Sequence, residues 1–139
     1  MKIVIEKSNA VEQLHLLSAH LGLKMQAPEI VSSVEDDEER IEPLWSAAAA
    51  ELAQLLTPYC VYGIVDNRVE YSLDMPDNWK SDHADALQQH CRTFIVNSLL
   101  ARWLYSLAPE SANLYKSMNV ECASAITGIL AMRRKPKSL

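Results

Sequence analysis

Apolar residues recur at intervals of three and four along most of this chain, a pattern that predicts helices rather than strands. The first such stretch is short: Ser8 or Asn9 can cap its start, and Gly22 is a natural stop. Its apolar face consists of Val11, Leu14, Leu17 and Leu21. Residues 2–6 before it are predicted to be a short strand or an extended arm. We therefore assign residues 1–31 to a leading arm and a short helix.

A second helical stretch, residues 32–57, opens with acidic side chains. Ser32 and Ser33 each stand three residues before an acid, which is the spacing of a capping box. The acidic side chains in the first turns face the positive end of the helix dipole, where negative charge is favourable. They are Glu35, Asp36, Asp37, Glu38 and Glu39. Pro43 removes a hydrogen bond further along, yet the apolar face continues past it, so we expect a kink or a short break there.

The periodicity changes in residues 59–73, where β-branched and aromatic residues flank the turn-prone pair Asp66 and Asn67. This arrangement predicts a β-hairpin. An isolated hairpin is marginally stable in water. We therefore expect it to pack on the helices or to pair with a neighbouring chain.

The second half of the chain, residues 81–134, predicts a helical hairpin. Its first helix, residues 81–107, is apolar on two sides and must therefore be covered on two sides. Pro109 suits the first turn of the second helix, and Pro136 stops it. The apolar stripe predicted for this second helix is Leu114, Tyr115, Met118, Cys122, Ala125, Ile126, Ile129 and Leu130. A basic tail, residues 135–139, closes the chain.

These elements predict a mainly α fold, a bundle of about four helices with one β-hairpin inserted between the second and third main helices. A length of 139 residues favours a single helical domain spanning 1–139. The net charge of −5 disfavours unspecific attachment to nucleic acid or to an anionic membrane. No apolar run approaches the length of a membrane span, and the N-terminus lacks the pattern of a signal peptide, which together predict a cytoplasmic location.

Residues capable of chemistry are present, but they follow no catalytic or metal-binding motif. Three cysteines, Cys60, Cys91 and Cys122, are odd in number and widely spaced, which indicates buried thiols rather than a disulfide framework. His83 and His90 are close in sequence to two aspartates but lack the spacing of a zinc site. We expect no catalytic residue, no metal and no cofactor.

The candidate functional residues are therefore those of interaction surfaces. The acidic start of the second helix and the basic end of the last helix are complementary in charge. Trp79 stands in a polar loop, and exposed tryptophans commonly anchor interfaces, whereas Trp103 is predicted to pack in the core. The candidates are Glu35, Asp36, Asp37, Glu38, Glu39, Trp79, Arg133, Arg134 and Lys135.

Three segments together carry a resemblance to a known family. They read Asp37-x-x-Arg40-Ile41-x-x-Leu44-x-x-Ala47-Ala48, then Leu52-x-x-Leu55, and later Leu100-x-x-Trp103-Leu104-Tyr105. In this order, behind a short leading helix, they resemble the head–tail connector proteins of tailed bacteriophages, small helical adaptors docked beneath the portal.

The resemblance implies a non-enzymatic structural subunit of a phage or prophage particle. Its partners would be further copies of itself in an oligomeric ring and a portal or tail-completion protein. DNA would pass through the lumen of the ring without specific binding, and the protein would be cytoplasmic during assembly and part of the virion afterwards.

Three other functions stay open from the residues themselves. The first is a helical protein-binding module or adaptor that uses Trp79 and the acidic run. The second is a metal-dependent enzyme with a site built from His83, His90 and nearby acids. The third, a DNA-binding regulator, is opposed by the acidic charge balance and by the lack of a helix-turn-helix pattern.

Overall fold

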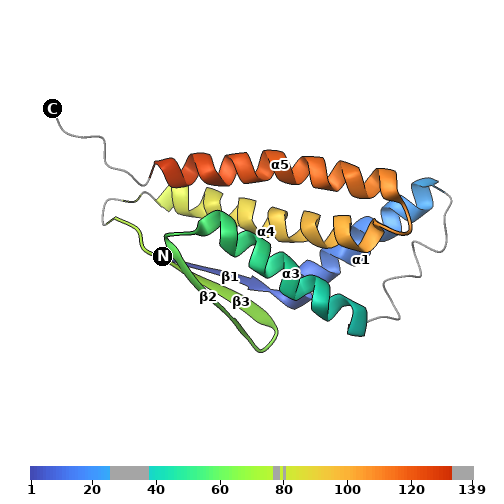
Figure 1. Ribbon diagram of the computed structural model, residues 1–139, viewed down its shortest axis with the longest axis horizontal. Helices are drawn as coiled ribbons and strands as arrows, with labels where there is room; N and C mark the ends of the chain where they lie inside the picture. Colours follow the sequence, from blue (N-terminus) through green and yellow to red (C-terminus); the bar gives the residue numbers. More distant parts are fainter. Residues whose placement is uncertain (26–37, 77–78, 80, 133–139) are drawn as a thin grey trace.

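The computed structural model describes residues 1–25, 38–76, 79 and 81–132, and shows helices stacked on one side of a small sheet (Figure 1). Helix α3 lies between the sheet and the pair formed by α4 and α5 (Figure 1). The mainly α prediction with a hairpin between the second and third main helices is confirmed. The elements are β1 (Lys2–Glu6), α1 (Lys7–Met25), α3 (Glu38–Leu56), β2 (Cys60–Val65), β3 (Arg68–Leu73), α4 (Ser81–Leu104) and α5 (Pro109–Ala131).

The sheet has three antiparallel strands in the order β1-β3-β2. The predicted hairpin is β2–β3, and it turns at Asp66, whose φ is 55°. Of the two alternatives for residues 2–6, the strand is correct, because β1 pairs along β3 with Ile3 opposite Tyr71. This third strand and the cover of α3 supply the support that a lone hairpin lacks.

Helix α4 forms the centre of the core. Helix α5 runs along one side of it, and α1 and α3 contact it on other sides (Figure 1). The prediction that this helix is covered on two sides is therefore confirmed, and Trp103 is fully buried as expected. Its buried residues are Leu87, Cys91, Phe94, Ile95, Asn97, Ser98, Leu99, Leu100, Trp103 and Leu104.

Two predicted helix ends are wrong. The helix predicted over residues 81–107 ends at Leu104. Gly22 does not stop the first helix, which continues to Met25 with Gly22 buried inside it. A single glycine costs a helix only about 1 kcal/mol, which the packing of the surrounding turns offsets. Of the two alternatives at Pro43, the short break is wrong, because α3 is continuous from Glu38 to Leu56, and the kink stays a prediction. Pro43 is exposed and is the sixth residue of α3, so the helix lacks one backbone hydrogen bond there, to the carbonyl of Glu39.

The apolar stripe predicted for the last helix is partly wrong. Leu114 and Met118 are exposed, while Asn119, which the stripe omitted, is buried. The face that α5 turns to α4 is instead Ala112, Asn119, Cys122, Ile126 and Leu130. Apolar residues occupy so much of this helix that periodicity alone left more than one face available for burial.

Candidate functional site

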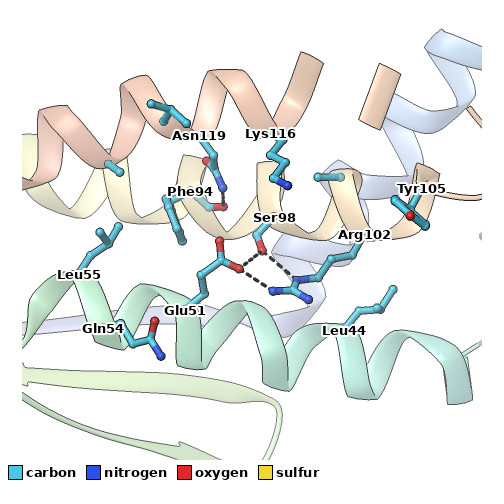
Figure 2. Close-up of a pocket in the computed structure, with 13 residues that line it drawn as sticks. Leu44, Glu51, Gln54, Leu55, Phe94, Ser98, Arg102, Tyr105, Lys116 and Asn119 are labelled. Atoms are coloured by element: carbon cyan, nitrogen blue, oxygen red, sulfur yellow. Dashed lines mark hydrogen bonds and ion pairs between the residues drawn. The ribbon is translucent and has the colours of Figure 1, made fainter. Parts of the chain in front are cut away.

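A groove of about 730 Å³ opens between α3 and α5, with α4 as its floor (Figure 2). The walls are largely apolar: Leu44 and Leu55 stand on α3, and Val120 and Ala123 stand on α5. Tyr105 closes one end from the last turn after α4 (Figure 2). Three helices far apart in sequence therefore build one concave surface.

The rim of this groove exposes two apolar side chains. Val120 is 66% exposed and Tyr105 is 75% exposed. Isolated exposed apolar residues are common on protein surfaces, but a concave set of them is typical of a binding site for another chain. The groove therefore presents apolar surface that a partner could cover.

A polar cluster crosses the middle of the groove and joins α3 to α4 (Figure 2). Arg102 donates from Nη2 to Oε2 of Glu51 over 2.6 Å. The buried hydroxyl of Ser98 donates to the same Glu51 oxygen over 3.2 Å and accepts from Nε of Arg102 over 3.4 Å. The two charged side chains are about 40% exposed, so water screens their attraction and its contribution to stability is small. The cluster links α3 to α4 across the groove.

Asn119 lies beneath the α5 wall and is 7% exposed. Its Nδ2 donates to the carbonyl oxygen of Phe94 over 3.0 Å, which ties α5 to α4 (Figure 2). Its Oδ1 is buried and has no hydrogen-bond partner in the described part of the chain. An unpaired buried acceptor costs free energy, so this residue is a weak point in the packing of α5.

The three cysteines are free thiols. The prediction that they are buried is correct for Cys91 and Cys122 and wrong for Cys60, which is half-buried. Burial, assisted by the neighbouring thiol of Cys122, raises the pKa of Cys91 to about 12. Burial also raises the pKa of Cys60 and of Cys122, and the Cys122 thiol contacts the carbonyl oxygen of His90 at 3.0 Å. At neutral pH these side chains are protonated and therefore poor nucleophiles.

His83 and His90, the two histidines considered for a metal site, both lie on α4. Among the residues that the structure describes, no group of three or more histidine, cysteine or acidic side chains converges as metal ligands would. The His83 ring instead contacts Trp79 edge to face, with the ring centroids 5.2 Å apart. Its Nδ1 is buried without a hydrogen-bond partner among the described residues.

Most of the interface residues predicted from sequence fall outside the described residues. These are Glu35, Asp36, Asp37, Arg133, Arg134 and Lys135. Glu38 and Glu39 form the first residues of α3. Trp79 is half-buried and packs against the core beside the start of α4. The acidic and basic surfaces stay predictions, and Trp79 presents only part of its ring to solvent.

The groove residues were missed by the sequence reasoning, although two signals point towards them. Glu51 is the lone charge within the alanine-rich turns of α3, and a charge there needs a partner or water. Ser98 and Arg102 are four residues apart, which places them on one face of α4. Neither signal shows that the two helices bring these side chains together.

The fold and the groove define the class of this protein as a mainly α domain with a small antiparallel sheet and an apolar interhelical groove. Comparison with known protein families, with curated proteins and with solved structures finds no significant match to this chain. None of the helices in the described ranges is both long enough and apolar enough to cross a membrane.

Proposed function

We propose that this protein is a non-enzymatic structural subunit that docks onto another protein through the groove between α3, α4 and α5. The observation that carries the proposal is the apolar, concave surface that these three helices build around the Glu51–Arg102 pair. Grooves of this kind accept the apolar face of an amphipathic helix, whose side chains repeat every three or four residues.

The dimensions of the groove support a helix as its occupant. Leu44 and Leu55 are separated along α3 by a helical rise of about 16 Å. That length accommodates about three turns of a partner helix. Lys116 stands on the α5 side of the groove, so an acidic residue on the partner helix would be favoured beside it.

The resemblance to head–tail connectors directs this proposal to a phage or prophage particle, with the portal or a tail-completion protein as the docking partner. A helical adaptor with no connection to a virion is the alternative, since the same groove would serve it. The connector proposal and the adaptor alternative differ in the partner that the groove binds and in whether tailed particles need the protein.

The test compares two glutamate substitutions on the same helix. Val120→Glu puts a charge in the groove, and Leu114→Glu, at a site 59% exposed that does not line the groove, is the matched control. Each full-length variant is co-expressed with the portal protein of the same phage or prophage, and the complex is measured by light scattering after gel filtration. We expect Val120→Glu to weaken the complex at least about tenfold while Leu114→Glu leaves it intact.

Equal binding by the two variants would overturn the groove as the docking site. Tailed, infectious particles from a phage that lacks the gene would overturn the connector assignment. A groove-dependent complex with a protein that belongs to no particle would instead favour the adaptor alternative.

A further inference from the structure

Strand β2 is an edge of the sheet, and its backbone is arranged to accept another strand. The N–H of Leu73 donates to the carbonyl of Met1 over 2.8 Å, and the N–H of Asp74 donates to the carbonyl of Tyr59 over 2.9 Å. Successive residues of β3 therefore direct their backbone hydrogen bonds alternately to β1 and to β2. The same alternation turns the N–H and C=O groups of Cys60, Tyr62 and Ile64 away from β3, towards the free edge.

The side chains of β2 are apolar on both faces of the sheet. Val61 is 78% exposed, while Tyr62, Ile64 and Val65 are each between 42% and 43% exposed. The strand, Cys60–Val65, contains no charged residue. A long apolar edge without charges is the feature that proteins avoid unless another strand covers it.

The opposite edge of the same sheet, strand β1, differs from β2 because it carries charged residues. Strand β1 begins with Lys2 and ends with Glu6, and both are exposed. Lys2 also pairs with Glu70 over 3.2 Å on the outer face of the sheet. Charges of this kind discourage strand pairing, so the sheet has one protected edge and one open edge.

We propose that β2 pairs antiparallel with β2 of a second copy of this chain, so that the two three-stranded sheets join into one continuous sheet. A two-fold axis perpendicular to the sheet passes through the pair of Tyr62 residues. This register sets each Cys60 opposite Ile64 of the second copy, so that every outward-facing backbone group meets another outward-facing group. The contact is isologous, since the same surface is used by both copies.

The absence of charge from this strand favours a second copy as the occupant. Two identical strands bring no like charges together here, and each contributes apolar side chains to both faces of the new sheet. The assembly closes as a dimer because the outer edges of the doubled sheet are both β1, with Lys2 and Glu6. No sheet residue lines the α3–α4–α5 groove, so the pairing of the two strands uses a different surface.

The test measures the mass of the full-length protein by analytical ultracentrifugation from about 1 to about 100 µM. We expect a monomer–dimer equilibrium. Val61→Lys and Ile64→Lys, which place charges on the open edge, should each weaken the dimer at least about tenfold. Leu23→Lys, at an α1 site 75% exposed, is the matched control and should leave the dimer unchanged.

Three results would overturn this inference. One is a monomer throughout the concentration range, which would leave the edge to a strand from a different protein. Another is a dimer that Val61→Lys and Ile64→Lys do not weaken. The third is a larger oligomer weakened equally by Val61→Lys and by Val4→Lys on the β1 edge, which would show head-to-tail pairing of β2 with β1. None of these results depends on the groove, so the proposed docking function is tested separately.

Discussion

The hydroxyl of Tyr71 donates a hydrogen bond to the backbone carbonyl of Ala49 over 2.7 Å, joining the central strand of the sheet to α3. Both residues are fully buried. Burial raises the pKa of the Tyr71 phenol well above its usual value, so this donor keeps its proton across the physiological range. The strand that supports the open β2 edge is therefore fixed to the helix that forms one wall of the groove.

Replacing Tyr71 by phenylalanine should lower the free energy of unfolding by about 1 kcal/mol, because a buried hydroxyl bond is lost while the ring still packs. Urea denaturation measures the change. Tyr62→Phe is the matched control: the Tyr62 ring stacks on Tyr71, with centroids 5.6 Å apart, but it is 42% exposed and should lose much less. A Tyr71→Phe variant as stable as the wild type would show that the bond to Ala49 is not stabilising.

Asn119→Leu should raise the free energy of unfolding by about 1 kcal/mol. The substitution removes a buried oxygen that has no partner among the described residues and places an apolar side chain against α4. The carbonyl of Phe94 loses one donor but keeps its place in the helical ladder of α4. Thermal and urea unfolding measure the effect, and a destabilised variant would show that Oδ1 has a partner in solution.

The free energy of unfolding should fall at alkaline pH, because the buried Cys91 thiol holds its proton more tightly in the folded protein than in the unfolded chain. The pKa of this thiol is raised from 9.0 to about 12 in the folded protein, so the unfolded chain releases this proton first as the pH rises. The contribution of the protonated thiol to stability is complete below about pH 9 and falls between about pH 9 and about pH 12. Urea unfolding at about pH 7 and about pH 10 measures the fall.

Cys91→Ala is the control for this pH dependence. The cavity that it leaves lowers stability at both pH values, but the fall between them should be smaller than in the wild type. An equal fall in both proteins would assign the effect to other groups, of which Tyr71 is the first candidate because its pKa is also raised by burial.

The local pattern was sufficient to predict α4 and the hairpin. Two apolar faces on one helix require cover on both, and the run of strand formers around Asp66 and Asn67 has few alternatives to a tight antiparallel turn. The groove was not predictable in this way. Glu51 and Arg102 are 51 positions apart, and their meeting depends on how α3 crosses α4.

By itself the sequence determined the order of the helices and the place of the hairpin, because helix and strand periodicities are properties of neighbouring residues. The tertiary structure decided which apolar residues are left uncovered. On α5, Asn119 is buried and Leu114 is exposed, because the face that meets α4 depends on the position of the whole helix. In the sheet, β1 occupies one edge of β3 and leaves the apolar β2 at the other, a choice made by pairing between residues far apart in the chain.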